Sequence, residues 1–336
     1  MWRSAASAFL LTGLVLGSVR AGEASSKPDS DAPLELVSPY QQYDLKLRAF
    51  YPAPRCPAGV LLYVCINGGR RLRLVLDSGA EFIVIGSKAA RSVRLSDGPE
   101  MDLVGLGTRP ARVGRAETVE IGPVTFRNCR VAFVDGTVIE GADGVIPLSL
   151  FSDFMVRLDL PEKALGLIPY PGVRDPEILS KRGVAKSNPL FVGTVLNEKH
   201  QGYVLLDTGA FRSAISREVA STLGGSPIAP QIGIGAGTGA ATGRLVSSAV
   251  HFEIAGQELI PDDLVALDLS NLSRHYGREI VGVLGFPALS PYILTVDYRE
   301  GFVEFAPPRK NGSRKSVIAI TATGMVAATG PAFMPR

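Results

Sequence analysis

The sequence predicts an all-β protein of two similar lobes, and three features of the chain lead to this fold class. A run of three apolar residues followed by Asp, Ser or Thr, Gly and Ala occurs twice, ending at Ala80 and at Ala210. A strand-like segment and a turn precede both copies. A glycine-containing segment and a closing hairpin follow both. An internal repeat the size of one small domain therefore organises the chain.

The aspartates of the two copies, Asp77 and Asp207, lie 207 − 77 = 130 positions apart. In each copy a predicted buried strand runs into a tight turn that begins at the carboxylate. A single Asp-Thr-Gly is more often an ordinary turn, because these residues form turns for local reasons. Two copies in matching surroundings favour a functional site. Two carboxylates held together share one proton, so the pair can act as base and as acid.

Two tetrapeptides resemble the paired active-site motifs of the aspartic protease superfamily: Asp77-Ser78-Gly79-Ala80 and Asp207-Thr208-Gly209-Ala210. Alanine in the fourth place is closer to the retropepsin-like branch than to the pepsins. The resemblance implies two retropepsin-like β-barrel lobes with the active-site cleft between them. It also implies that Asp77 and Asp207 are the catalytic residues.

The resemblance implies supporting roles for the neighbouring residues. The hydroxyls of Ser78 and Thr208 would hydrogen-bond backbone across the lobe interface, while Gly79 and Gly209 let the chain turn closely. An apolar-apolar-Gly strand would cross each active-site loop. Its candidates are Val283, Leu284 and Gly285 in the second lobe and Val145, Ile146 and Pro147 in the first. Proline at position 147 departs from the pattern, because proline fixes φ and removes a backbone donor.

Glycine-containing segments after each motif resemble flap hairpins, which close over substrate. The flap candidates are Gly105 and Gly107 in the first lobe and Gly233 and Gly235 in the second. Ordinary loop glycines are the competing interpretation. Glu81, directly after the first motif, is expected to be a solvated residue.

Ala80 and Ala210 carry a prediction about pH. A hydroxyl in their place could hydrogen-bond the charged carboxylates and lower their pKa, and alanine cannot do so. We therefore expect activity at mildly acidic to near-neutral pH.

The N-terminal segment predicts export. Residues 1–21 contain Arg3, an apolar run over residues 5–19 and a small-residue cleavage site near Ala21, which together are typical of a signal peptide. The protein would then be periplasmic or secreted, with no stable membrane insertion. An uncleaved N-terminal anchor is the alternative.

Composition narrows the possible partners. The chain has 35 basic and 32 acidic residues, a balance that gives no sign of nucleic-acid binding. Its histidines and cysteines show no metal-ligand spacing, so no metal or cofactor is predicted. Cys56, Cys65 and Cys129 leave open either a disulfide between the first two or buried free thiols.

These observations divide the chain and predict its activity. The predicted segments are a signal peptide (1–21), a flexible leader with a possible edge strand (22–55), the first lobe (56–170), a linker (171–187), the second lobe (188–306) and a tail (307–336). We expect an aspartic endopeptidase that hydrolyses a peptide or protein substrate with water. One chain supplies both aspartates, so a monomer suffices, although a homodimer stays open. The alternative function is a catalytically silent, exported peptide-binding module.

Overall fold

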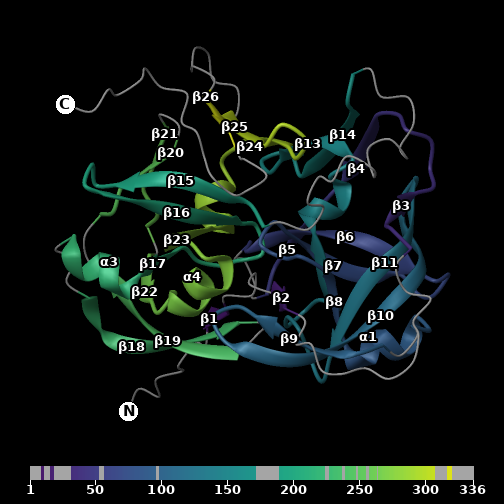
Figure 1. Ribbon diagram of the computed structural model, residues 1–336, viewed down its shortest axis with the longest axis horizontal. Coiled ribbons are helices and arrows are strands. Elements are labelled where there is room, and N and C mark those ends of the chain that lie inside the picture. The colour runs from purple at the N-terminus through teal and green to yellow at the C-terminus, as the bar shows by residue number, and fades with distance from the viewer. Residues whose placement is uncertain are drawn as a thin grey trace.

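The computed structural model is mostly β-strand, with two lobes side by side (Figure 1). The second lobe lies at the left of that view and the first lobe at the right. The structure describes residues 9–10, 16–18, 32–52, 57–95, 98–171, 189–223, 227–236, 239–246, 249–254, 257–262, 264–306 and 316–319. The linker expected over residues 171–187 lies outside these ranges, apart from residue 171.

The first lobe is built on one sheet. Its elements are β2 (Leu16–Ser18), β3 (Glu35–Leu36), β5 (Arg48–Phe50), β6 (Gly59–Ile66), β7 (Leu72–Asp77), β8 (Ile83–Gly86), α1 (Ser87–Ser92), β9 (Glu100–Val104), β10 (Thr108–Ile121), β11 (Val124–Val134), β12 (Gly144–Pro147) and η1 (Leu148–Phe151). The strand order is β2-β9-β10-β11-β8-β12-β7-β6-β5, with β3 beside β11. Asn67 and Gly68 join β6 to β7 with φ values of 49° and 63°. Positive φ at both positions is the turn that Asn-Gly favours in a hairpin.

The second lobe repeats this plan. Its elements are β1 (Phe9–Leu10), β15 (Phe191–Leu196), β16 (His200–Asp207), β17 (Ala214–Ser216), α3 (Arg217–Thr222), β18 (Pro227–Ala236), β19 (Gly239–Val246), β20 (Phe252–Ile254), β21 (Gln257–Leu259), β22 (Val265–Leu267), α4 (Ser270–Tyr276), β23 (Ile280–Gly285) and α5 (Phe286–Leu289). The strand order is β1-β18-β19-β22-β17-β23-β16-β15-β20-β21. In both lobes the strand that ends in aspartate therefore lies between a hairpin partner and a parallel strand.

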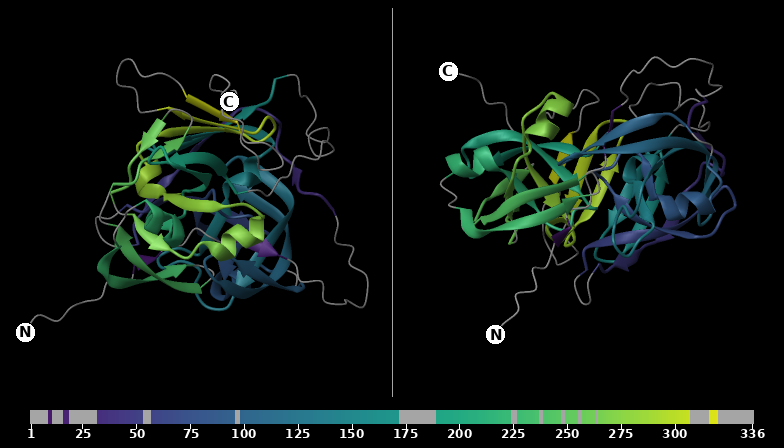
Figure 2. Two further views of the ribbon diagram at one scale, coloured as in Figure 1. Left: turned by 60° about the vertical axis from the view of Figure 1, so that its left-hand side comes forward. Right: turned by 90° about the horizontal axis from the view of Figure 1, so that it is seen from below.

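A third sheet joins the lobes. It consists of β4 (Tyr43–Lys46), β13 (Phe154–Asp159), β14 (Ala164–Pro169), β24 (Ile293–Asp297), β25 (Phe302–Ala306) and β26 (Ser316–Ala319). The closing hairpin of the first lobe pairs with that of the second through β13 and β24. In Figure 2 the yellow strands of this sheet lie between the green and blue lobes. The closing hairpins thus form a shared sheet as well as ending their own lobes.

Segments expected to be peripheral contribute strands. The possible edge strand before residue 56 is in fact three strands, since β3 pairs with β11, β4 with β14 and β5 with β6. The tail after residue 306 supplies β26, which pairs with β25. These pairings extend the first-lobe sheet and the shared sheet beyond the repeat.

The strands that lead to the two aspartates are buried on both faces. In β7, Leu74 and Leu76 pack into one hydrophobic cluster and Val75 into another, and all three are fully buried. In β16, Val204 and Leu206 join the first of these clusters, while Leu205 packs into a third. Side chains of a strand alternate between its faces, so a strand covered on both sides must be apolar throughout. This explains the continuous apolar run before each aspartate.

Two short N-terminal strands lie between the lobes (Figure 1). β2 pairs antiparallel with β9, and β1 pairs parallel with β18. The signal peptide over residues 1–21 stays a prediction. Within the described residues, no helix combines the length and the apolar character needed to cross a membrane.

Candidate active site

The structure brings Asp77 and Asp207 together at the centre of the molecule. Each is the last residue of its strand, β7 or β16, and each is fully buried. The two carboxyl groups lie close enough for the charge of Asp207 to raise the pKa of Asp77. The aspartates come from the two halves of the repeat, so the site exists only because both lobes meet.

Backbone amides hold one oxygen of each carboxyl group. Gly79 N–H donates to Asp77 Oδ1 at 2.8 Å, and Gly209 N–H donates to Asp207 Oδ1 at 2.9 Å. Ala210 N–H adds a further bond to Asp207 Oδ1 at 3.0 Å. Oδ2 of each aspartate is buried and receives no hydrogen bond from an N–H or O–H group of the described residues. One oxygen of each carboxyl group is therefore left without a hydrogen-bond partner among the described residues.

The environment raises the pKa of both carboxyl groups. Burial is the largest cause for Asp77 and for Asp207, because removal from water disfavours the charged form. The nearby charge of Asp207 raises the pKa of Asp77 further, and the amide of Gly79 partly opposes this. Such a pair titrates as a unit and holds one proton over a range in which isolated aspartates are ionised.

The hydroxyls beside the aspartates cross from lobe to lobe. Thr208 Oγ1 donates to Leu76 O at 2.8 Å and accepts from Ser78 N–H at 3.1 Å. Ser78 Oγ donates to Leu206 O at 2.7 Å and accepts from Thr208 N–H at 3.0 Å. All four bonds are buried, and each lobe supplies two donors. This is the cross-lobe arrangement that the resemblance implies, and it fixes the two active-site loops relative to each other.

Two comparisons bear on this geometry. A family model described as aspartyl protease matches residues 62–149, and one described as retroviral aspartyl protease matches residues 177–277. The chain contains two retropepsin-like aspartyl protease domains. The matched segments include β7 with Asp77 and β16 with Asp207, so each domain contributes one aspartate. No curated protein matches the chain.

In both aspartyl protease domains a parallel strand supports the active-site loop. Pro147 of β12 pairs in register with Asp77, as Gly285 of β23 does with the second aspartate. Gly285 N–H donates to Ser213 Oγ at 3.2 Å. Counting six residues from each aspartate, the first-domain counterpart of Ser213 (207 + 6) is Ile83 (77 + 6), whose side chain offers no acceptor. Proline at position 147 lacks the backbone N–H that Gly285 has, and the first domain also lacks the serine hydroxyl that would accept from it. The strand keeps its register with Asp77.

Gly285→Ala is expected to destabilise the protein by about 1–3 kcal/mol, because an added methyl group has no room. A Cβ at this position would lie 2.4 Å from Arg212 O and 2.8 Å from Ala210 O, both backbone atoms. Gly59→Ala is the matched control, since its Cβ would meet its nearest neighbour at 3.5 Å. Thermal unfolding of both variants checks this. Equal melting temperatures would contradict the close approach seen at Gly285.

The flap candidates of the two domains occupy equivalent hairpins. Gly105 and Gly107 form the turn between β9 and β10, closed by a bond from Gly105 N–H to Gly107 O at 2.8 Å. Gly233 and Gly235 lie within β18, paired with Thr242 and Ala240 of β19. The first pair is thus at a hairpin tip and the second along a hairpin arm.

The expectation that Glu81 is a solvated residue is wrong. Its side chain is half-buried and accepts a hydrogen bond from Tyr276 Oη at 3.1 Å. Tyr276 belongs to α4, a helix that the sequence analysis did not predict. The sequence does contain the start and stop signals of this helix, Asp268 and Gly277. Asp268 accepts a hydrogen bond from Ser270 N–H at the helix start, and Gly277 ends the helix at φ 62°.

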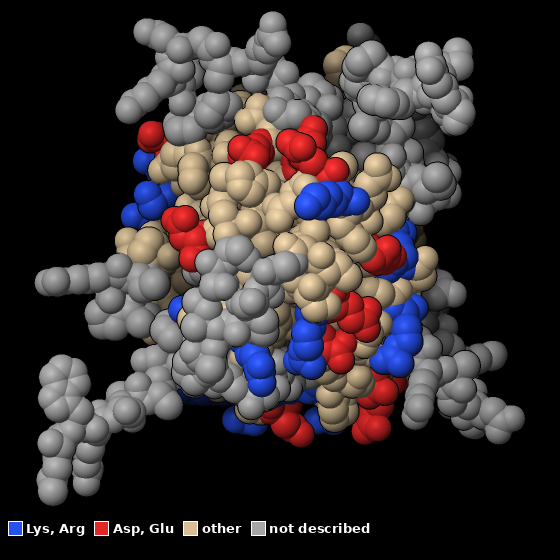
Figure 3. All heavy atoms as spheres, turned by 90° about the vertical axis from the view of Figure 1, so that its left-hand side faces the viewer, with Lys and Arg blue, Asp and Glu red and all other residues tan. Residues whose placement is uncertain are grey.

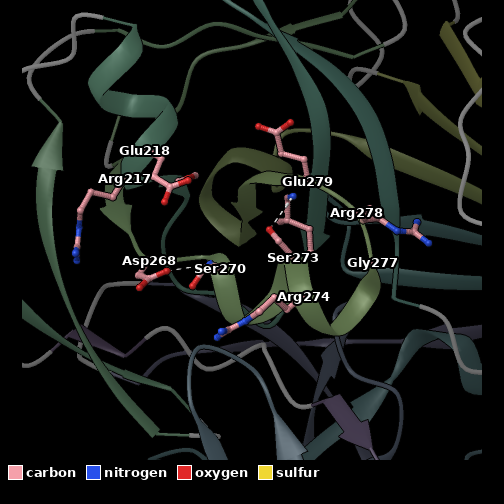
Figure 4. Close-up of a pocket in the computed structure, with 11 residues that line it drawn as sticks. Arg217, Glu218, Asp268, Ser270, Ser273, Arg274, Gly277, Arg278 and Glu279 are labelled. Carbon is pink, nitrogen blue, oxygen red and sulfur yellow. Dashed lines mark hydrogen bonds between the residues drawn. The ribbon is translucent and has the colours of Figure 1, made fainter.

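A cavity of about 620 Å³ lies against α4 on the second domain (Figure 4). Ser270, Ser273, Arg274 and Gly277 line it from one face of the helix. Side chains of α3 line the opposite wall. The cavity contains none of the predicted site residues.

On the face shown in Figure 3, acidic and basic side chains are interspersed rather than gathered by sign.

The cysteines and metal-ligating residues supply no second site within the described ranges. Cys65 and Cys129 are free thiols, and Cys56 lies outside those ranges. Burial raises the pKa of Cys129 to about 12, so this thiol is protonated and unreactive at neutral pH. The described residues contain no group of three or more His, Cys, Asp or Glu placed to hold a metal ion.

Proposed function

We propose that the protein is an aspartic endopeptidase in which Asp77 and Asp207 activate one water molecule. The observation that carries the proposal is the buried pair of carboxyl groups, one from each aspartyl protease domain, in which the charge of one raises the pKa of the other. A carboxyl pair with one shared proton contains both a base and an acid. The two Oδ2 atoms supply the positions at which water and a peptide carbonyl would bind.

The proposed reaction uses only these two groups. The charged carboxylate removes a proton from water as the water oxygen attacks the carbonyl carbon of the scissile bond. The protonated carboxyl gives its proton to the carbonyl oxygen, which yields a neutral tetrahedral diol. The diol then returns one proton to a carboxylate, and the other carboxyl protonates the leaving nitrogen as the C–N bond breaks. The pair ends with one proton, as it began.

Extended peptides are the proposed substrates. The outer edges of β9 and β18 already pair with short segments of the chain itself, residues 16–18 and residues 9–10. Free strand edges bind extended peptides through main-chain hydrogen bonds. One chain supplies both aspartates, so a monomer is the proposed active form. Specific activity that fell on dilution would argue for a dimer instead.

A peptide library tests the proposal directly. The purified chain is incubated with the library, and mass spectrometry identifies new N- and C-termini. We expect cleavage that pepstatin, an inhibitor of aspartic proteases, abolishes. Peptides that bind without being cleaved at any pH would instead support the silent binding module.

Cleavage is expected to peak at mildly acidic to near-neutral pH. The reaction needs one proton on the pair, and burial raises the pKa at which that last proton is lost. Ala80 and Ala210 provide no hydroxyl that would oppose this. Activity should therefore decline on the acid side, as the second carboxylate gains a proton, and on the alkaline side, as the shared proton is lost. A kcat/KM profile with its maximum below about pH 3 would contradict this expectation.

A further inference from the structure

Helix α4 belongs to the second domain, yet two of its side chains bind the first domain. Asn271 Nδ2 donates to the carbonyl of Gly105 at 2.9 Å, at the tip of the first flap. Tyr276 Oη donates to Glu81, which directly follows the Asp77 motif. The two contacts lie at opposite ends of the helix. One short helix therefore touches both the flap and the active-site loop of the other domain.

Apolar contacts reinforce the flap contact. Val104, which ends β9, is only 9% exposed and lies in a hydrophobic cluster of second-domain residues that includes Leu269 and Leu272. Leu106, at the flap tip, packs against the same cluster. To open, the flap must therefore break the bond to Asn271 and expose Val104 to water. These contacts hold the flap tip against α4.

The contact with the active-site loop has packed residues at both ends. The ring of Tyr276 packs against Phe191, with ring centroids 4.5 Å apart, which fixes the direction of its hydroxyl. Burial and the charge of Glu81 raise the pKa of Tyr276, so the phenol remains a donor. Ala80, the residue before Glu81, is 1% exposed within the first-domain core. Movement of α4 would therefore displace Glu81 and the loop that carries Asp77.

The residue after the second aspartate motif also contacts the opposite domain, but through an apolar side chain. Phe211 holds the place after the second motif that Glu81 holds after the first. It packs against Phe50 of the first domain, with ring centroids 5.7 Å apart. That contact is apolar, whereas the contact of Glu81 with Tyr276 is polar.

We propose that α4 is an inter-domain clamp that couples closure of the first flap to the placement of the Asp77 loop. Asn271 and Tyr276 are its positioning residues, since neither belongs to the reacting pair. The coupling is reciprocal, because anything that loosens one end of the helix also loosens the other. The kinetic consequence of the clamp rests on the proposed proteolysis, whereas the structural consequence does not.

Amide hydrogen exchange of the full chain tests the structural consequence. Asn271→Asp keeps the shape of the side chain and removes its donor, and Tyr276→Phe keeps the ring and removes the hydroxyl. Each variant should speed exchange about five-fold at its own contact and also at the other, over residues 98–112 and residues 76–84. Arg274→Ala is the control, since this side chain of the same helix lines the cavity of Figure 4. A variant that affects only its own contact, or an equal effect of Arg274→Ala, would overturn the clamp.

Kinetics test the positioning role. Asn271→Asp should raise KM about five-fold with kcat within about two-fold of the unsubstituted protein, because a loosened flap holds bound substrate less firmly. An unchanged KM beside faster flap exchange would overturn the positioning role of Asn271. If the unsubstituted protein cleaves no peptide, the proposed function fails, and the exchange experiment still decides whether the clamp exists.

Discussion

Asp207→Asn is expected to lower kcat/KM for peptide cleavage by at least about 10²-fold, and Asp77→Asn by a similar factor. An amide can neither take a proton from water nor give one to the leaving group, and general acid–base catalysis contributes about 10²–10⁴-fold. The two substitutions should not be additive, because either one removes the shared proton on which the pair depends. Initial rates on a cleaved library peptide measure the effect.

Stability supplies an independent readout for these variants. An acid whose pKa is raised on folding binds its proton more tightly in the folded state, so its contribution to stability is present at low pH and is lost as pH rises through the folded pKa. Asparagine does not ionise. Asp77→Asn should therefore melt at a higher temperature than the unsubstituted protein at pH 7, with a smaller difference at pH 4.

A matched control separates the loss of the aspartate's role in the reaction from the simple loss of one negative charge. Asp44 is an exposed residue of β4 that accepts a hydrogen bond from Gln42. Asp44→Asn removes one negative charge and should leave kcat/KM unchanged. If Asp207→Asn lost no more activity than Asp44→Asn, the carboxyl pair would not be the catalytic group.

The repeated halves and the position of each aspartate could be predicted from sequence because their signals are local. An apolar run, an Asn-Gly turn and an Asp-Ser-Gly or Asp-Thr-Gly turn each depend on residues within one hairpin. The all-β fold class and the two retropepsin-like domains are confirmed. The same local signals explain why β6 and β7 occur where the hairpin before Asp77 was expected.

The shared sheet could not be predicted in this way. β13 and β24 pair although more than a hundred residues separate them in the chain, and neither sequence specifies its partner. The register of Asp159 with Ile293 depends on how the two lobes dock. The contacts of α4 have the same origin, since Asn271 and Gly105 are 166 positions apart. Local periodicity carries no information about such long-range pairs.

Pro147 shows how a single position can mislead. The family pattern has glycine at this position of the loop-crossing strand. Judged by that pattern alone, proline predicts a disturbed first half of the site, because it lacks a backbone donor. The structure shows that the corresponding donor in the second domain, Gly285 N–H, serves a serine hydroxyl. The first domain has Ile83 in place of that serine. The two changes compensate each other, and only the pairing of strands brings them together.

Thr208→Val is expected to destabilise the protein by about 2–4 kcal/mol, more than Gly285→Ala. Valine matches the shape of threonine but leaves Ser78 N–H and Leu76 O without their buried hydroxyl partner, and each such group costs about 1–3 kcal/mol. Thr208→Ser is the matched control, since it keeps the hydroxyl and loses one methyl group. Urea unfolding of both variants measures the difference.

The hydrogen bonds lost in Thr208→Val also hold the two aspartate loops together, so the variant tests how the site is assembled. The hydroxyls of Ser78 and Thr208 each bond the backbone of the opposite lobe, so removing one also loosens the loop held by the other. Ser78→Ala and Thr208→Val should therefore be coupled, with an interaction free energy of about 0.5–3 kcal/mol in a double-mutant cycle. Activity should fall along with stability, because the aspartates lie beside each other only while both loops stay in place. Additive effects, or a Thr208→Val variant as stable as Thr208→Ser, would mean that the aspartates are held together by the shared sheet instead.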